Sequence, residues 1–215
     1  VEGEEFIDVV SMLTVWGIPF DILRLDEQRI QINRFLDGLG GPKYGCMIWM
    51  ADPNKLEGNS ANYATLKKAV EEYDISMIAL VDNIKTKEVA ELVGVNYLGL
   101  SNLGQQGEAD KFSITGKHYI TTELEGVNLP DIKYSVPASI PKADGITTNI
   151  INDLNPELIS IVNCSASESV SVLGMVGENP QFVVRDINKN TKAIWIGGGK
   201  DWFRTYPVMR EIFRK

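Results

Sequence analysis

Residues 44–81, which read YGCMIWMADPNKLEGNSANYATLKKAVEEYDISMIALV, decide the fold. Two continuous apolar runs, Tyr44–Met50 and Ile75–Val81, have the length and composition of strands that are buried on both faces. Between them, Asn59–Tyr73 carries its apolar residues at helical spacing. Because parallel strands need a crossover connection, this order predicts a βαβ unit whose two strands lie side by side at the centre of a sheet.

The chain before and after this unit extends the same pattern. A helix is expected over residues 5–16 and a short strand over Phe20–Leu25. A third helix is expected over Thr86–Val93, followed by a strand over Val95–Leu100. Strands that alternate with helices predict an α/β fold with a mainly parallel, doubly wound sheet of the flavodoxin-like kind.

From residue 110 onward, short strands and turns replace the helices. Lys111–Leu124 alternates polar and apolar residues around a Thr-Gly-Lys turn and predicts a hairpin. Further strands are expected at Leu158–Val162, Val170–Val176, Phe182–Asp186 and Ala193–Gly197, and a closing helix at Tyr206–Phe213. We interpret residues 1–215 as a single domain with a βαβ part over 1–109 and a β-rich part over 110–215. The first strand of a doubly wound fold is missing before the first helix. Either it was removed with upstream sequence from a longer protein that could carry flanking domains, or the sheet is built without it.

Composition excludes several classes of partner. The net charge of -8 and the pI of about 4.8 exclude a nucleic-acid partner, because a phosphate backbone must be met by clustered basic side chains. The sequence has no run of 18 apolar residues, so we expect no membrane insertion. The two cysteines, Cys46 and Cys164, lie in apolar runs, and both are expected to be buried and unpaired.

Four segments carry a resemblance to a known superfamily. They are Trp16–Leu23 (WGIPFDIL), Tyr44–Trp49 (YGCMIW), Gly116–Thr121 (GKHYIT) and Lys192–Gly199 (KAIWIGGG). In this order they resemble the class I glutamine amidotransferase-like superfamily, particularly its ThuA-like and non-catalytic relatives in bacterial carbohydrate-active proteins. The third segment is similar to the H-P-I-T element of ThuA-like domains, with Tyr119 in place of the proline. The resemblance implies a carbohydrate-related role and a periplasmic or extracellular location.

The catalytic residues of that superfamily do not match this sequence. The resemblance implies a nucleophilic cysteine on a glycine-flanked turn after an apolar strand, where backbone N–H groups can form an oxyanion hole. The matching residues here are Leu80–Lys85 (LVDNIK), which include no cysteine, serine or glycine. The partner histidine and glutamate of a late loop are also missing, because the one histidine, His118, falls in the predicted hairpin. Amidotransferase chemistry is therefore not expected.

Polar residues follow three of the predicted strands, where an open parallel sheet binds its ligands. These candidate ligand-binding residues are Asp52 and Asn54, Asp82 and Asn83, and Ser101 and Asn102. Asp and Asn at strand ends also form turns and cap helices, so a structural role stays open for all of them. A functional role would be to bind a small polar ligand such as a sugar.

Three functions are consistent with these observations. The first is a non-catalytic binding or interaction module without cofactor or metal. The second is a ThuA-like carbohydrate-active hydrolase that uses Asp52, Asp82 and His118, for which the three side chains must converge in one pocket. The third is a structural spacer or oligomerisation domain, which is favoured if this edge of the sheet has no pocket.

Overall fold

A computed structural model describes residues 4–23, 29–50, 60–80, 87–100, 112–122, 162–176 and 179–197, together with four two-residue strands. The helices are α1 (Glu4–Val15), η1 (Ile32–Arg34), α2 (Ser60–Glu71) and α3 (Lys87–Val93). The first strands are β1 (Cys46–Trp49), β2 (Ser76–Leu80), β3 (Val95–Leu100) and β4 (Phe112–Ile114). The two-residue strands are β5 (Lys133–Tyr134), β6 (Ile140–Pro141), β7 (Thr147–Thr148) and β8 (Leu158–Ile159). The last strands are β9 (Val162–Ala166), β10 (Ser171–Val176), β11 (Asn179–Asp186) and β12 (Lys192–Ile196).

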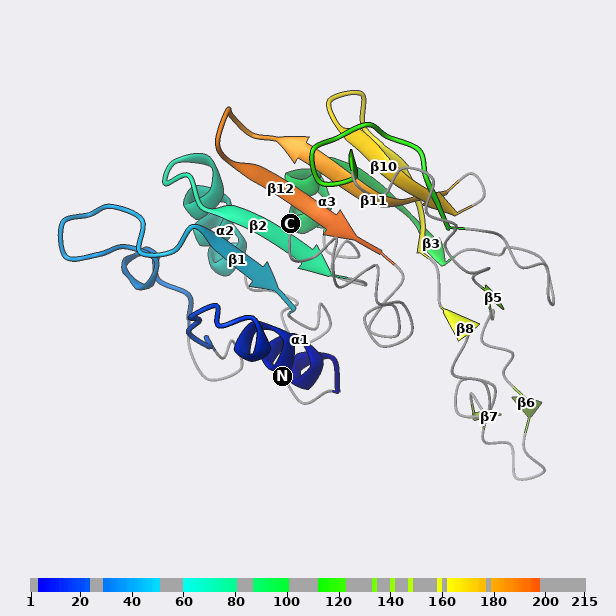
Figure 1. Ribbon diagram of the computed structural model, residues 1–215, viewed down its shortest axis with the longest axis horizontal. Helices are drawn as coiled ribbons and strands as arrows, with labels where there is room; N and C mark the ends of the chain where they lie inside the picture. The colour runs from blue at the N-terminus through cyan, green and yellow to red at the C-terminus, as the bar shows by residue number, and fades with distance from the viewer. Residues whose placement is uncertain are drawn as a thin grey trace.

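The fold is mixed α/β and is organised around a six-stranded sheet in the order β1-β2-β12-β11-β10-β4 (Figure 1). The pairs β1–β2 and β2–β12 are parallel, whereas β12–β11, β11–β10 and β10–β4 are antiparallel. Strand β12, close to the end of the chain, therefore pairs directly with β2 from the first half. Residues on both sides of position 110 build one sheet.

The predicted βαβ unit is confirmed, with one correction. Strands β1 and β2 lie side by side in parallel, with Ile48 opposite Ile78, and α2 connects them. The prediction that both strands are central is wrong for β1, which is the outermost of the described strands in this sheet. Trp49 of β1 is buried because its side chain belongs to the core beneath the helices, not because strands lie on both sides. An apolar run reports that a strand's faces are covered and does not report its place in the strand order.

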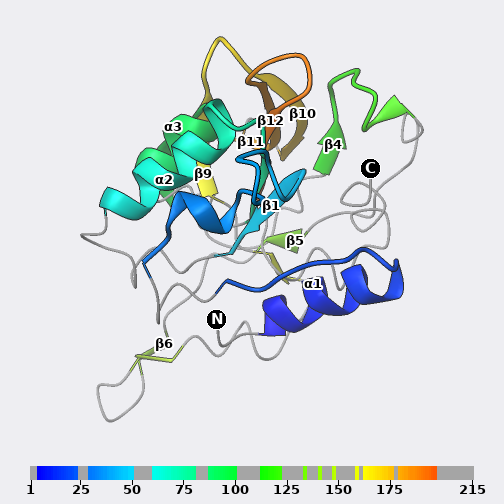
Figure 2. The same cartoon turned by 90° about the vertical axis from the view of Figure 1, so that its left-hand side faces the viewer.

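Helices α2 and α3 cover one face of the sheet (Figures 1 and 2). The predicted apolar face of α2 is buried: Tyr63, Leu66, Ala69 and Val70 are each at most 7% exposed. They form one core with alternate residues of the sheet strands, namely Trp49, Met77, Ala79, Val183, Ala193 and Trp195. This two-residue alternation is the expected side-chain period of strands that turn one face toward helices.

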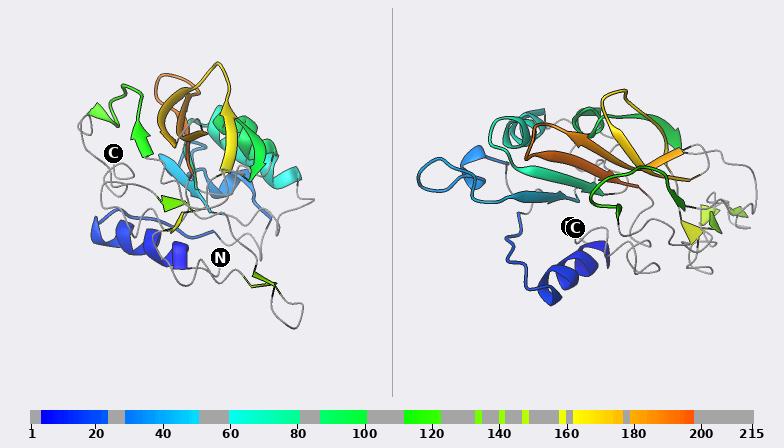
Figure 3. Two further views of the ribbon diagram at one scale, coloured as in Figure 1. Left: turned by 90° about the vertical axis from the view of Figure 1, so that its right-hand side faces the viewer. Right: turned by 45° about the horizontal axis from the view of Figure 1, so that its top comes forward.

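The opposite face carries rows of apolar side chains in register across the strands. One row runs from Ile48 through Ile78 and Ile194 to Val184. Residues 115–122, which follow the sheet strand β4, lie on this side of the sheet, away from α2 and α3 (Figure 2). Helix α1 also lies apart from α2 and α3, on the other side of β1 (Figure 3).

Glycines end the first and third helices. Gly17 has a φ of 66°, and the N–H groups of Gly17 and Ile18 donate to the carbonyl oxygens of Thr14 and Leu13, which is a Schellman motif. Gly94 follows α3 with a φ of 76°, and its N–H donates to the Glu91 carbonyl oxygen at 3.2 Å. At Gly94 a Cβ atom would also lie 2.3 Å from Val170 Cγ1, so only glycine fits there.

Three other predictions about secondary structure are wrong. Residues 20–23 of the predicted strand at Phe20–Leu25 are irregular, and residues 24–25 lie outside the described residues. Strand β3 forms, but it pairs antiparallel with β9 in a separate two-stranded ribbon. In place of a local hairpin over Lys111–Leu124, β4 pairs with the distant β10. The predicted closing helix at Tyr206–Phe213 lies outside the described residues. Among the helices that are described, none has both the length and the apolar character needed to cross a membrane.

Candidate functional site

The carboxyl ends of β1, β2 and β12 meet at one edge of the sheet, because these strands are parallel neighbours. We call this the carboxyl edge. Ligands of open α/β sheets bind at such an edge. Four of the predicted ligand-binding or catalytic residues follow β1 and β2 in the chain and lie outside the described residues: Asp52, Asn54, Asp82 and Asn83. In the sequence, Asp82 comes two positions after Leu80, the last residue of β2.

The remaining pair of predicted ligand-binding residues follows a different strand. Ser101 and Asn102, which also lie outside the described residues, come directly after β3. The alternation of helices and strands predicts β3 to be the next parallel strand of the central sheet, but its described partner is the antiparallel strand β9. Strand pairing therefore does not align the carboxyl end of β3 with those of β1 and β2.

The described part of the carboxyl edge is tightly packed. Trp49, at the end of β1, lies with its ring centroid 6.2 Å from that of Tyr63 in α2. After β12, the Gly197 N–H donates to the Gln181 carbonyl oxygen at 2.8 Å. A Cβ atom at Gly197 would lie 2.5 Å from Gln181 Oε1, so the first residue of the Gly-Gly-Gly run is required by packing.

His118, the remaining candidate catalytic residue, lies in a loop and not in a strand. The loop is closed by Thr121, which is fully buried: its Oγ1 accepts from the His118 N–H at 3.1 Å, and Oγ1 lies 2.9 Å from the Gly116 carbonyl oxygen as its donor. The His118 carbonyl oxygen accepts from the Thr121 N–H at 2.9 Å. The imidazole is half-buried, and its Nδ1 accepts from the Ile120 N–H at 3.3 Å. These bonds satisfy the loop backbone and make His118 part of its structure.

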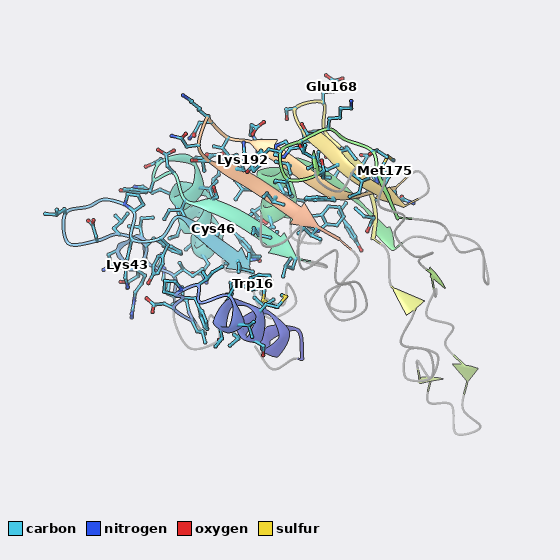
Figure 4. The ribbon with its side chains drawn as sticks, in the orientation of Figure 1. Trp16, Lys43, Cys46, Glu168, Met175 and Lys192 are labelled. Atoms are coloured by element: carbon cyan, nitrogen blue, oxygen red, sulfur yellow. The ribbon has the colours of Figure 1, made fainter. Side chains whose placement is uncertain are left out.

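The charged groups that act on His118 belong to the hairpin between β11 and β12. Asp186 ends β11, Lys192 begins β12, and the two residues are cross-strand partners whose side chains form an ion pair. The Lys192 Nζ lies 5.9 Å from the ring centroid of Tyr119, which neighbours His118 (Figure 4 labels Lys192). Burial, and then the positive charge of Lys192, lower the pKa of His118 below its usual value, while Asp186 acts in the opposite direction.

This environment places His118 at the amino-terminal end of β12, opposite the carboxyl edge. The Lys192 N–H contacts Ser76 at the start of β2, whereas Ile196 is paired with Leu80 at its end. The four residue steps between Lys192 and Ile196 correspond to about 13 Å along the strand. His118 therefore lies close to Lys192 and Asp186. This is the opposite end of the strands from the carboxyl edge, after which Asp52 and Asp82 follow in the chain.

The two cysteines differ in environment. Cys164 is buried and free, as predicted, its thiol donates to the Pro180 carbonyl oxygen at 3.1 Å, and burial raises the pKa of that thiol to about 12. Cys46 is also free, but the prediction that it is buried is wrong: it begins the outermost strand and is exposed (Figure 4). The atoms packed around its sulfur nevertheless raise the pKa of the thiol to about 11. Because Cys46 is exposed, a reagent can reach its sulfur. Because the pKa of the thiol is raised, only a small fraction of it is thiolate at neutral pH.

The described residues form no metal site, since no three His, Cys, Asp or Glu side chains among them gather around one point. Sequence reasoning missed the Asp186–Lys192 pair beside His118. The sequence carries a signal for this pair, because Asp186 and Lys192 lie on either side of residues 187–191 and face each other once the hairpin forms. The pair was missed because nothing in the sequence indicates that this hairpin lies beside His118.

The comparisons with known proteins inform the fold. The sequence matches no family model and no curated protein. The structure resembles a cytoplasmic protein from Salmonella typhimurium LT2, with a TM-score of 0.59 and 14% sequence identity over 98% of this chain and 85% of that one. At this identity the likeness shows a shared fold.

A second similar structure is the exo-beta-1,4-mannosidase Op5Man5 from Opitutaceae bacterium strain TAV5. Its TM-score is 0.49 at 11% identity, and the alignment covers 97% of this chain and 29% of the mannosidase.

Proposed function

We propose that this chain is a doubly wound, amidotransferase-like α/β domain that performs no acyl transfer and acts as a binding or interaction module. Its ligand site is the carboxyl edge formed by β1, β2 and β12, and its ligand is a small polar molecule such as a sugar. The parallel arrangement of these three strands supports this choice of edge, because their carboxyl ends converge there.

The observation that carries the proposal is the position of His118. A hydrolase of the ThuA-like kind would need Asp52, Asp82 and His118 to act on one substrate atom, and a general base must come within hydrogen-bond reach of the proton that it removes. His118 is the one histidine in the sequence, and it sits beside Lys192 at the amino-terminal end of β12. Its bonds to the loop backbone account for it as a structural residue.

The sequence at the carboxyl edge supports binding without catalysis. Leu80–Lys85 offers no Cys or Ser nucleophile, and no glycine that would let the backbone turn sharply around one. The polar residues that follow β1 and β2 supply carboxylate and amide groups, which can donate to and accept from ligand hydroxyl groups. We therefore assign Asp52, Asn54, Asp82 and Asn83 to ligand binding. Ser101 and Asn102 are not part of this proposed site, because they follow β3, which pairs with β9 and not with β1 or β2.

A thermal-shift screen with a panel of monosaccharides and short oligosaccharides tests this proposal. A saccharide that binds only the folded chain, at a free concentration of about 100 times its dissociation constant, stabilises the folded chain by about 2.7 kcal/mol. We expect Asp82→Asn to abolish that shift and His118→Asn, the matched variant at the other end of the sheet, to retain it. Chromogenic glycosides are expected to remain intact with all three proteins.

Two results would contradict the proposal. Glycoside turnover by the wild type that is lost in His118→Asn would establish the hydrolase instead. An absence of any thermal shift across the whole panel would refute the carbohydrate ligand and favour the spacer or oligomerisation domain.

A further inference from the structure

The segment of residues 115–122, which we call the covering segment, is attached to the sheet at one end by backbone bonds. The Thr115 N–H donates to the Leu173 carbonyl oxygen of β10 at 2.9 Å. Gly116 lies so close to β10 that a Cβ atom there would be 2.4 Å from the Val172 carbonyl oxygen. Beyond this point the segment crosses toward the hairpin of β11 and β12, where Tyr119 is met by the Lys192 ammonium group.

The turn at the far end of the covering segment is closed by the neutral form of His118. Its Nδ1 accepts the Ile120 N–H, which is possible only while that nitrogen is unprotonated. Its ring contacts the Tyr119 ring at a centroid distance of 4.4 Å. Ile120, the residue held by this bond, is 3% exposed, so the bond stands at the point where the segment buries its apolar side chain.

Two charged groups face the imidazole from the hairpin, and they act in opposite directions. Lys192 is 17% exposed, so its charge is only partly screened by water. Asp186 is 58% exposed and already pairs with Lys192. A protonated His118 would compete with Lys192 for the one partly exposed carboxylate of Asp186. The positive charges of His118 and Lys192 would also repel each other.

We propose that His118 is a pH-sensitive latch within the covering segment: the neutral imidazole closes the turn from His118 to Ile120, and protonation opens that turn and exposes the Ile120 amide group to water. Protonation removes the acceptor of the Ile120 N–H and adds a positive charge beside Lys192. The lowered pKa of His118 is consistent with this, because burial and Lys192 both oppose the charged form. The proposal is independent of the function assigned to the carboxyl edge, which lies at the other end of β12.

Hydrogen exchange followed by mass spectrometry tests the latch. A peptide that covers residues 115–122 is compared at about pH 7.5 and about pH 5.5, after correction for intrinsic exchange rates. Losing one hydrogen bond of ordinary strength corresponds to exchange that is about two- to tenfold faster at the lower pH. A peptide that covers α2 serves as the reference and is expected to show no such change.

The His118→Asn variant keeps a side-chain acceptor but does not titrate, so its covering segment is expected to exchange at the same corrected rate at both pH values. An equal acceleration in wild type and His118→Asn would overturn the proposal, as would no acceleration in the wild type once its imidazole is protonated. If His118→Asn does not fold, Lys192→Met replaces it. Removal of the like charge should move the midpoint of the wild-type transition to higher pH, and an unchanged or lower midpoint would overturn the proposal.

Discussion

Two glycines with nearly the same backbone conformation are expected to differ in how much they tolerate a methyl group. Gly17 and Gly94 follow α1 and α3 with φ values of 66° and 76°. A Cβ atom at Gly17 meets nothing within 4 Å, whereas at Gly94 it would lie 2.3 Å from Val170 Cγ1 and 3.1 Å from Ser167 Oγ. Alanine at either position pays the left-handed backbone penalty, and only Gly94→Ala adds an overlap with its neighbours.

The magnitudes follow from these two terms. The left-handed conformation costs a non-glycine residue about 1–2 kcal/mol, which is the whole expected loss for Gly17→Ala. Overpacking adds about 1–3 kcal/mol, so Gly94→Ala is expected to lose about 2–5 kcal/mol. The free energy of unfolding of each variant is measured by urea denaturation.

A double variant separates the two terms. Val170→Ala removes the methyl group that the new Cβ atom would strike, so the loss in Gly94→Ala/Val170→Ala should be smaller than the sum of the two single losses. Equal losses for Gly17→Ala and Gly94→Ala, or strict additivity in the double variant, would refute the close approach of the β9–β10 turn to the end of α3.

Three more outcomes are expected from the described contacts. Arg185 Nη1 donates to the carbonyl oxygens of Glu91 and Leu92 at the end of α3, at 2.8 and 3.0 Å, and Arg185→Met removes both bonds. This variant should lower the free energy of unfolding by about 1–3 kcal/mol in urea denaturation, and no loss would contradict the capping role of Arg185. A disulfide reagent should modify Cys46 in the native protein, faster as the pH rises, and Cys164 only after unfolding; modification of Cys164 first would contradict the assigned burial. The folded structure lowers the pKa of His118, so the unfolded chain binds the proton of His118 more readily than the folded chain does. The free energy of unfolding should therefore fall as the pH drops below about 6.5, until the pH reaches the pKa of the folded state. A His118→Asn variant with the same pH dependence would show that His118 is not its source.

Local structure was predictable where the signal is local. The ends of α1 and α3 follow from glycines that can adopt a positive φ, and α2 follows from apolar residues at helical spacing. The hairpin of β11 and β12 follows from two apolar runs around a polar turn.

Strand pairing was not predictable in the same way. Strand β3 is as apolar as a strand of a parallel sheet. Nothing in its own residues shows that its partner is the antiparallel strand β9 and not a parallel neighbour. The position of β12 between β2 and β11 joins residues more than a hundred positions apart, and β4 likewise reaches β10 and not its sequence neighbours. A pattern of two-residue alternation defines a face and leaves the neighbour undetermined.

The candidate site divides along the same line. The assignment of polar residues to the ends of β1 and β2 needs only the βαβ unit, which the sequence predicts. The surroundings of His118 need the contact between the covering segment and the hairpin of β11 and β12, which depends on long-range packing.

The central claim is that His118 belongs to the amino-terminal end of β12 and not to a catalytic group at the carboxyl edge. Because it is the one histidine in the sequence, its pKa can be followed by NMR in the wild type and in Asp52→Asn, Asp82→Asn and Asp186→Asn. We expect Asp186→Asn to lower the pKa of His118, since it removes the attractive carboxylate, and the other two variants to leave it unchanged within about 0.2 because salt screens charges beyond about 10 Å. A fall of about one unit or more in Asp52→Asn or Asp82→Asn would place that carboxylate within about 4–6 Å of the imidazole and contradict the account.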